Sequence, residues 1–311
     1  MRVLVTGATG LVGHYLLARL LQDGHQTIGA VRSNPEPHQI LVGEINAKTD
    51  WKQAVSNCDV VVHAAARVHQ MRDDAIDSLA EFRRVNATGT LCLAHQAAAA
   101  GVKRLVFIST IKVNGDFTEV GQPFTADDAP APNDPYAVSK HEAEQLLHQI
   151  AAETGMEVVI IRPPLVYGPG VKANFESMMR WLSHGVPLPL ATVTENRRSL
   201  VALENLADLI VTCLNHPAAA NQTFLVSDGE DLSTAELLKR MGCALGRPAR
   251  LFYVPTELLK LGAALVNKPG IHQRLCGSLQ VDIAKTRQLL GWTPPISVDE
   301  GLRCTAEGFR E

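Results

Sequence analysis

The chain lacks any strong excess of charge of one sign. Its 29 basic and 32 acidic residues leave a formal net charge of −3 at pH 7. This balance gives no electrostatic reason to expect a nucleic-acid partner. Aromatic residues are also scarce, at 5% of the chain, so stacking platforms for single strands are not expected. Both shortages argue against a nucleic-acid-binding function.

The chain also lacks paired cysteines, clustered histidines and a membrane-spanning run. Its six cysteines are scattered without a CxxC pair, which favours reduced core residues over disulfides or metal ligands. The histidines show no ligand spacing, so no metal site is expected. The longest apolar stretch, at 258–266, is broken by Lys260 and is too short to cross a bilayer. With strand-like sequence starting at Met1 and no signal peptide before it, we expect a cytoplasmic protein without a membrane partner.

What the chain does have is a glycine turn between an apolar run and a helical pattern. Residues 1–5 form the apolar run, TGATGLVG occupies 6–13, and leucines then recur at helical spacing. This order predicts a buried strand, a tight turn and an amphipathic helix. Gly7, Gly10 and Gly13 would let backbone N–H groups approach a pyrophosphate at the positive end of the helix. A GxxGxxG string is weak evidence alone, but its place between a strand and a helix favours dinucleotide binding.

Strands and helices alternate along most of the chain, whose 46% hydrophobic content suffices for a large core. This alternation predicts an α/β protein with a doubly wound, parallel Rossmann sheet. The expected strands are 26–31, 40–45, 59–63, 104–109, 157–161 and 224–226. The expected helices are 50–57, 76–100, 136–153, 205–215, 233–245, 255–267 and 282–290.

The regular alternation fails after residue 165. Residues 165–198 contain prolines and glycines and predict a loop-rich insertion over the sheet. From Leu232 onward the pattern is mostly helical. We therefore expect a Rossmann domain formed by residues 1–165 and 199–229. A smaller, mostly helical C-terminal substrate domain would comprise residues 166–198 and 230–311.

The residue after the second predicted strand bears on cofactor choice. In dinucleotide folds this position lies beside the adenosine ribose, where an acidic residue selects NAD and an arginine can pair a 2′-phosphate. Here the position holds Arg32, and no acidic residue occurs before Glu36. This favours NADP(H) without excluding NAD. The alternative is an ordinary surface arginine in a loop.

A YxxxK sequence, Tyr136 to Lys140, opens a predicted helix after the N-cap Asp134. Side chains four apart on a helix share a face, so the phenol and the ammonium are expected to point the same way. A nearby ammonium favours phenolate and would lower the tyrosine pKa, which suits proton exchange with a hydroxyl. YxxxK is common by chance, but here it follows the glycine turn and a strand ending at Ser109-Thr110.

Together the motifs resemble those of an extended short-chain dehydrogenase/reductase of the nucleotide-sugar epimerase/dehydratase family. The finer likeness is to bacterial UDP-glucose 4-epimerase-like members and UDP-4-keto-6-deoxy-N-acetylhexosamine 4-reductases of surface-polysaccharide pathways. The matching stretches cover nearly the whole chain and are TGATGLVG (6–13), DVVVHAAA (59–66), VNATGT (85–90), FISTIKVNG (107–115), YAVSK (136–140), RPPLVYGPG (162–170), NRRSL (196–200), CGSLQVD (276–282) and LLGWTPP (289–295).

The resemblance implies catalytic roles for Thr110, Tyr136 and Lys140. Tyr136 would be the acid/base, Lys140 would hold the nicotinamide ribose and tune Tyr136, and Thr110 would orient the reacting hydroxyl. The residues expected at the NAD(P) cofactor are Gly7, Thr9, Gly10, Leu11, Val12, Gly13, Arg32, Glu44, Ile45, Ala64, Ala65, Ala66, Tyr136, Lys140 and Pro163. Those expected at a UDP-sugar are Ser109, Lys112, Asn174, Arg198 and Arg274.

The sequence departs from the family pattern at three places, and the last of them bears on which reaction is expected. Glu44 stands where an aspartate normally precedes the residue that meets adenine. Asn114 replaces the tyrosine of the usual VYG, which differs from well-studied 4-epimerases. Ile111 and Lys112 occupy the places of the dehydratases' Asp-Glu pair, which argues against 4,6-dehydration.

The resemblance thus implies hydride transfer at C4 of a UDP-hexose or UDP-N-acetylhexosamine. Epimerisation and 4-keto reduction remain alternatives of nearly equal weight, with Arg32 leaning toward reduction by NADPH. A non-catalytic NADP(H)-binding redox sensor of the same fold is the alternative from another class, since fold alone is poor evidence of activity. The helices 76–100 and 136–153 resemble the pair through which such enzymes dimerise, and we expect a homodimer.

Overall fold

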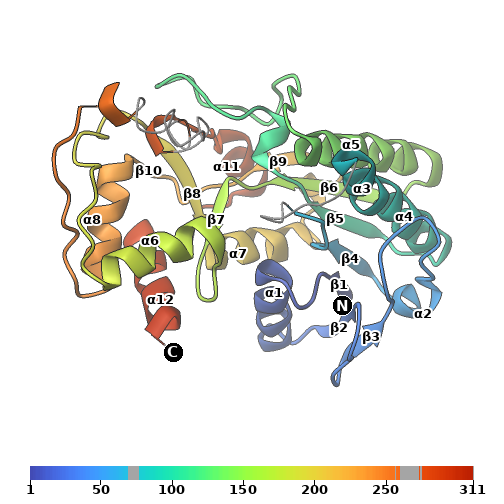
Figure 1. Ribbon diagram of the computed structural model, residues 1–311. Helices are drawn as coiled ribbons and strands as arrows, with labels where there is room; N and C mark the ends of the chain where they lie inside the picture. Colours follow the sequence, from blue (N-terminus) through green and yellow to red (C-terminus); the bar gives the residue numbers. More distant parts are fainter. Residues whose placement is uncertain (69–76, 256, 260–272, 274, 311) are drawn as a thin grey trace.

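The computed structural model describes residues 1–68, 77–255, 257–259, 273 and 275–310 (Figure 1). Within these residues a seven-stranded sheet runs in the order β3-β2-β1-β4-β5-β6-β9, and every pairing is parallel. The strand order reverses direction between β1 and β4, as in a doubly wound dinucleotide fold. The predicted fold class is confirmed. The strands are β1 (Arg2–Thr6), β2 (Gln26–Val31), β3 (Gln39–Leu41), β4 (Val60–His63), β5 (Arg104–Ile108), β6 (Glu157–Arg162) and β9 (Thr223–Leu225).

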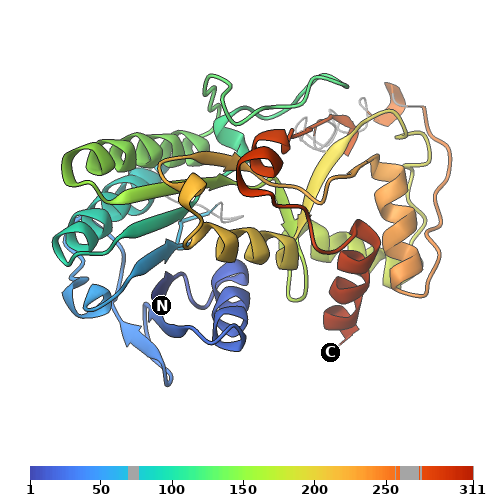
Figure 2. The same cartoon turned by 180° about the vertical axis from the view of Figure 1, so that it is seen from behind.

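Helices cover both faces of this sheet (Figures 1 and 2). Because side chains alternate along a strand, Val3 and Val5 of β1 face one layer while Leu4 faces the other. The first layer holds α1 (Leu11–Gln22) and α7 (Leu203–Cys213), and the second holds α4 (Gly89–Ala99) and α5 (Pro135–Thr154). Strands buried on both faces explain the continuous apolar runs in the sequence. The short helices around the sheet are α2 (Lys52–Val55), η2 (Ile111–Val113), η3 (Pro217–Ala219) and α11 (Ala284–Leu290).

The predicted long helix over residues 76–100 is interrupted by a π-helical segment. It begins as α3 (Ser78–Phe82), continues as η1 (Arg83–Thr88) with π-helical hydrogen bonds, and ends as α4. Gly89 lies where the helix passes the Ile45 side chain, and a Cβ there would lie 2.6 Å from Ile45 Cγ2. Wide π turns are often associated with functional sites, and η1 carries Asn86 of the VNATGT motif.

A second, three-stranded sheet corrects the prediction for the middle of the chain. It runs in the order β10-β8-β7, formed by β10 (Asp231–Leu232), β8 (Arg198–Ala202) and β7 (Leu165–Tyr167). The segment predicted as loop-rich is irregular at 168–172 and 184–197, but it also contains α6 (Ala173–Ser183), which the sequence analysis did not predict. Its prolines and glycines flank this helix rather than interrupt it. Helices α6, α8 (Thr234–Ala244) and α12 (Val298–Arg310) gather with this sheet at one end of the molecule (Figure 1).

Several predicted elements lie elsewhere than expected or outside the described residues. The strand expected at 40–45 is limited to β3, and most of the helix expected at 255–267 falls in residues that the structure does not describe. No helix in the described part of the chain combines the length and the apolar character needed to cross a membrane. All six cysteines are free thiols.

Candidate active site

The glycine turn lies against the end of β4. Gly7 has φ +69°, and a Cβ on it would lie 2.8 Å from the Ala65 nitrogen. A Cβ on Gly13 would lie 2.2 Å from the Gly7 oxygen. Both positions therefore require glycine for steric reasons. The turn is closed by the Gly10 N–H, which donates to the Gly7 carbonyl over 2.8 Å, and Gly10 begins α1 as its N-cap.

This arrangement fits a dinucleotide on observations of the chain itself. The first residues of α1 point their backbone N–H groups toward the carboxyl ends of β1 and β4, where ligands bind in such sheets. Thr9 and Gly10 are exposed at this end, Leu11 and Val12 are half-buried, and Ala64, Ala65 and Ala66 follow β4 as half-buried small residues. The structure thus brings these predicted cofactor residues together, although their roles stay a proposal.

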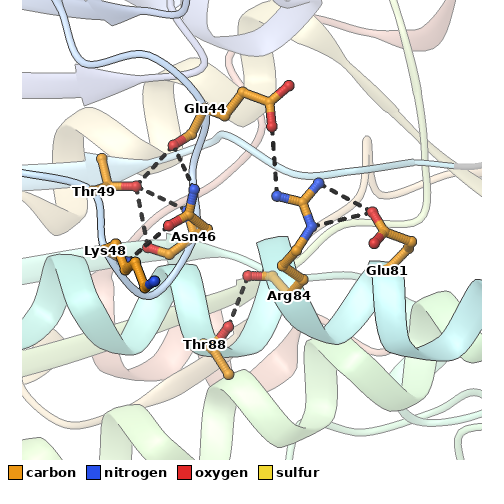
Figure 3. Close-up of polar contacts among 7 residues, drawn as sticks. All are labelled: Glu44, Asn46, Lys48, Thr49, Glu81, Arg84 and Thr88. Carbon is orange, nitrogen blue, oxygen red and sulfur yellow. Dashed lines mark hydrogen bonds and ion pairs between the residues drawn. The ribbon is translucent and has the colours of Figure 1, made fainter.

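The two residues predicted to lie beside the adenosine, Arg32 and Glu44, differ in their surroundings. Arg32 follows β2, is exposed, and takes part in no ion pair among the described residues. The Glu44 backbone carbonyl accepts hydrogen bonds from Thr49 Oγ1 (2.8 Å) and Asn46 Nδ2 (3.3 Å), which fixes the loop (Figure 3). Its carboxylate points to Arg84 on η1, with 3.5 Å between Glu44 Oε2 and Arg84 Nη1. Glu44 therefore has a protein partner.

A buried histidine, His63, ends β4 and is linked through Thr6 to the loop that follows this strand. The Ala65 N–H donates to Thr6 Oγ1 (3.1 Å), which lies 2.6 Å from His63 Nδ1. The other ring nitrogen, His63 Nε2, lies 2.8 Å from Thr90 Oγ1, whose hydroxyl donates to the Asn86 carbonyl over 2.7 Å. Burial, followed by the charge of Lys140, lowers the pKa of His63 to about 3. The imidazole is therefore neutral at pH 7 and serves as a fixed hydrogen-bonding element.

We expect His63 to make the protein sensitive to acid. With a folded pKa of about 3 and an ordinary pKa of 6.5, the unfolded state binds more protons between these values. Stability should therefore fall as the pH drops below 6.5, by about 1.4 kcal/mol per pH unit. Urea unfolding of His63→Asn across this range should show a flatter pH dependence than wild type, from a lower starting stability. His148→Asn, at an exposed position on α5, is the control and should follow the wild-type slope. Equal slopes for wild type and His63→Asn would contradict this assignment.

Lys140 is almost completely buried, with 1% of its surface exposed. Its ammonium donates to the Ile108 carbonyl over 2.6 Å and lies 3.8 Å from the centroid of the Phe107 ring. Burial lowers the pKa of Lys140 to about 7, and the charge of Glu144 opposes that effect. The ammonium is thus held by a carbonyl at the end of β5 and by a cation–π contact.

Tyr136 occupies the first turn of α5 and is half-buried, with its ring edge-on to Phe82 at 6.0 Å between centroids. Burial, and then the charge of Asp134, raise its pKa to about 12. The prediction that Lys140 lowers this pKa is wrong for the protein as described, because desolvation of the phenolate dominates. The Tyr136 backbone is fixed by Ser139, whose hydroxyl donates to the Tyr136 carbonyl over 2.7 Å.

Asn86 joins helix α5 to the loop that follows β4. Its side-chain amide donates to Ser139 Oγ (3.0 Å) and to the Arg67 carbonyl (3.0 Å), while its Oδ1 accepts from the Arg67 N–H (2.8 Å). The buried Asn86 therefore ties the loop after β4 to the turn that carries Tyr136. The sequence analysis did not predict this role, although the VNATGT stretch was the available signal.

The end of β5 presents two adjacent hydroxyls. Thr110 Oγ1 accepts from the Lys112 N–H over 3.3 Å as the N-cap of η2. Ser109 is 4% exposed, and its hydroxyl donates to Glu144 Oε1 over 2.5 Å. The Lys112 ammonium pairs with Asp134 Oδ2 at 2.5 Å, which joins η2 to the N-terminus of α5. Thr110 is therefore the partly accessible hydroxyl of the two, and Lys112 already has a partner within the chain.

Two of the remaining predicted substrate residues, Asn174 and Arg198, lie on different elements. Asn174 is exposed in the first turn of α6. Arg198 begins β8, donates from Nη1 to the Gly277 carbonyl over 3.1 Å, and has its pKa lowered by burial. Arg274 lies outside the described residues. Pro163 is buried after β6, and its carbonyl accepts from the Ile111 N–H over 3.0 Å.

Beyond Asn86 and His63, the sequence analysis missed Phe107, Glu144 and Arg162. Glu144 follows Lys140 by one helical turn, a spacing that could have indicated it. Over the described ranges, no three His, Cys, Asp or Glu side chains come together as metal ligands.

The glycine turn at β1 and the pair of Tyr136 and buried Lys140 on α5 define a Rossmann protein of the short-chain dehydrogenase type. Residues 3–227 match the NAD dependent epimerase/dehydratase family, and the chain belongs to this family. The UDP-glucose 4-epimerase of Vibrio cholerae is 50% identical over 311 residues, covering 99% of this chain and 95% of that protein.

Two solved structures support the fold. The UDP-N-acetylglucosamine 4-epimerase from Bacillus cereus has a TM-score of 0.82 at 21% identity and covers 100% of both chains. The UDP-glucuronic acid 4-epimerase from Bacillus cereus, in complex with NAD, has a TM-score of 0.80 at 20% identity. It covers 100% of this chain and 96% of that chain.

Proposed function

We propose that this protein is an NAD(P)-dependent nucleotide-sugar oxidoreductase of the 4-epimerase type, acting at C4 of a UDP-hexose or UDP-N-acetylhexosamine. The observation that carries the proposal is the Tyr136–Lys140 pair on the first turns of α5, beside the hydroxyls that end β5. The 50% identity to a UDP-glucose 4-epimerase over 99% of the chain supports the substrate class.

The glycine turn and the small residues after β4 would hold the dinucleotide, which supplies reversible two-electron oxidation at C4 when bound. Tyr136 exchanges a proton with the C4 hydroxyl. Its raised pKa of about 12 means that the neutral phenol predominates until positive charge approaches it. Lys140 holds the nicotinamide ribose, and Thr110 orients the reacting oxygen.

For substrate binding, we propose that residues 166–198 and 230–311 form a substrate domain. Asn174, Arg198 and Arg274 would contact the sugar nucleotide, because two arginines can neutralise a diphosphate through forked hydrogen bonds. Lys112 could join them only by leaving Asp134. A role in sugar biosynthesis for surface polysaccharides follows from the likeness of the IKVNG and NRRSL stretches.

The panel that tests this function uses UDP-glucose, UDP-galactose and their N-acetyl counterparts, with products separated by chromatography. Formation of the C4 epimer without net change in nicotinamide absorbance supports epimerisation. Stoichiometric oxidation of NADPH by a UDP-4-keto sugar supports 4-keto reduction instead. A protein that binds NADP(H) but turns over none of these sugars would be a redox sensor, and the proposal would be withdrawn.

The position of Arg32 favours net reduction with NADPH. Its exposed guanidinium follows β2 without an ion pair in the described structure, so it is free to pair a 2′-phosphate. Arg32→Ala should weaken NADPH binding by about 1–2 kcal/mol, roughly 5- to 30-fold in Kd, and leave NADH binding unchanged. Fluorescence titration with both nucleotides measures this, and Arg250→Ala is the control. Equal effects on the two nucleotides would show that Arg32 does not read the phosphate.

We also propose a homodimer through the face formed by η1, α4 and α5. A shallow groove on this face is lined by residues of η1 and α5, namely Arg83, Ala87, Thr88, Glu142, Gln145, Leu146 and Gln149. Light scattering that finds only a monomer across the working concentration range would remove this part of the proposal.

A further inference from the structure

A buried ion pair between Glu144 and Arg162 lies one helical turn from Lys140. Glu144 follows Lys140 by one turn of α5 and is 2% exposed. Arg162, at the end of β6, donates from Nε to Glu144 Oε1 over 3.0 Å and from Nη2 to Oε2 over 2.6 Å. The Ser109 hydroxyl donates to the same Oε1 over 2.5 Å. The carboxylate thus receives hydrogen bonds from two strand ends, β5 and β6.

The hydrogen-bond chain continues past Arg162. The Arg162 Nη1 donates to Asn114 Oδ1 over 2.9 Å, and the Asn114 amide donates to the Thr125 carbonyl over 2.9 Å. Asn114 is the residue that replaces the tyrosine of the usual VYG. The chain of contacts therefore links α5, the end of β6 and the loop that follows η2.

Stability alone is a weak explanation for this arrangement. Desolvating two charges costs several kcal/mol per ion, and a well-packed apolar pair of similar size is often as stable or more stable. Arg162 is 5% exposed and Glu144 is 2% exposed, so both charges bear that cost. A cost of this size beside a candidate active site indicates a functional role.

The geometry commits the Ser109 hydroxyl to Glu144. A serine has one hydroxyl proton, and that of Ser109 is donated to Oε1, inside the protein. Thr110 has extended backbone angles, φ −156° and ψ 147°, so its side chain points to the opposite side from that of Ser109. With Ser109 fixed on the Glu144 side, the Thr110 side chain lies on the other side of the strand, where this residue is partly accessible.

We propose that Glu144, held by Arg162, is a positioning residue that fixes Ser109 so that Thr110 addresses the substrate, and that keeps Lys140 charged. The proposal deepens the proposed function and rests on it for the roles of Thr110 and Lys140. It assigns Ser109 to the supporting network rather than to the substrate contact expected from the sequence.

The electrostatic half of the proposal, that Glu144 keeps Lys140 charged, is argued from the groups that surround Lys140. Glu144 is the carboxylate of α5 whose charge acts on Lys140, and β5 contributes the Ile108 carbonyl and the Phe107 ring. From β4 comes His63, whose pKa of about 3 leaves it neutral. From β6 comes the positive Arg162, which is neutralised by Glu144. Glu144 is therefore the group that offsets the burial of the Lys140 ammonium.

The charge of Glu144 is itself secured by its partners. Burial raises the pKa of this carboxyl, but the hydrogen bonds from Arg162 and Ser109 and the charge of Arg162 outweigh burial and hold it below its usual value. Glu144 is therefore ionised throughout the neutral range. Replacing it with glutamine leaves one oxygen that can accept from Ser109, removes the charge, and puts an NH2 group where Oε2 accepts from Arg162.

The first test measures NADH affinity by fluorescence as a function of pH, and it needs no sugar substrate. Wild-type affinity should fall as the pH rises through the Lys140 titration, because the ammonium holds the ribose. In Glu144→Gln the same fall should occur at a pH lower by about one unit. Glu153→Gln, an exposed carboxylate on the last turn of α5, is the control and should follow wild type. Coincident profiles for Glu144→Gln and wild type would overturn the electrostatic half.

A second variant covers the case in which Glu144→Gln does not fold because Arg162 is left unpaired. The double variant Glu144→Gln with Arg162→Met removes both charges, a replacement that buried pairs commonly tolerate. Because the double variant lacks the Arg162 guanidinium as well as the Glu144 carboxylate, its profile should shift to lower pH by less than that of Glu144→Gln alone. An unshifted profile would count against the proposal equally.

The positioning half is tested by comparing the adjacent hydroxyls. Thr110→Ala should lower kcat by about 10²-fold or more, the cost of removing one oriented hydrogen-bond donor, with little change in KM. Ser109→Ala should lower kcat by a smaller factor, about 2- to 10-fold, because the Thr110 hydroxyl remains and only the hydrogen bond that positions it is lost. Equal losses in both variants would overturn the assignment. If wild type turns over no UDP-sugar, the proposed function fails, whereas the NADH profiles still decide the role of Glu144.

Discussion

Replacing Tyr136 with phenylalanine is expected to lower kcat with the preferred UDP-sugar by about 10²- to 10⁴-fold, the range for loss of a positioned acid/base. The substitution removes only the phenolic oxygen. The ring contact with Phe82, at 6.0 Å between centroids, and the Ser139 bond to the Tyr136 carbonyl do not involve that oxygen. Folding and NADH affinity should therefore change little.

The measurement is steady-state turnover together with NADH fluorescence titration and a thermal unfolding curve. Tyr253→Phe is the matched control, because this tyrosine is 74% exposed and loses the same atom. Turnover by Tyr136→Phe at near the wild-type rate would refute the assignment of Tyr136 as the acid/base. A loss of turnover that is accompanied by lost NADH binding would instead point to a structural effect.

Replacing Gly7 with alanine is expected to remove most cofactor affinity and to destabilise the protein. Two costs combine at this position. The left-handed φ of +69° costs an alanine about 1–2 kcal/mol, and overpacking against the Ala64–Ala65 backbone adds about 1–3 kcal/mol. Because the backbone of the loop cannot yield without moving β4, the turn must shift. We expect a loss of about 2–3 kcal/mol in NADH binding, about 30- to 150-fold in Kd.

Gly24 provides a matched control for this effect. It has a similar φ of +79°, but a Cβ there would have nothing within 4 Å. Gly24→Ala therefore carries the left-handed cost alone and should leave NADH affinity at the wild-type value. Urea unfolding and fluorescence titration of both variants separate the two terms. If the two variants lose equal affinity, then steric contact with the end of β4 is not what requires glycine at residue 7.

The local patterns of the sequence determined most of the Rossmann half of the molecule. The apolar runs of β1, β4, β5 and β6 are buried on both faces, so their composition alone identified them as strands of a parallel sheet. The glycine turn was also predicted from local sequence, and Gly13 is constrained by Gly7 and Ala8 of the same strand-turn-helix unit, whereas Gly7 is constrained by Ala64 and Ala65, which follow β4. The N-cap of α5 was also predicted, since Asp134 accepts from the Ala137 N–H as expected.

What the sequence could not determine depends on contacts between distant segments. Strand β8 is stabilised by pairing with β7 and β10, more than 25 residues away on either side, so its own pattern gave no signal. The pKa of Tyr136 is raised because the phenolate is desolvated, and the spacing of two residues on a helix does not reveal this burial. The partner of Ser109 was equally hidden, because Glu144 and Arg162 meet only when α5 packs on β6. Local sequence thus determined the elements and the glycine turn, whereas burial and long-range packing decided the charge states and which hydroxyl is accessible.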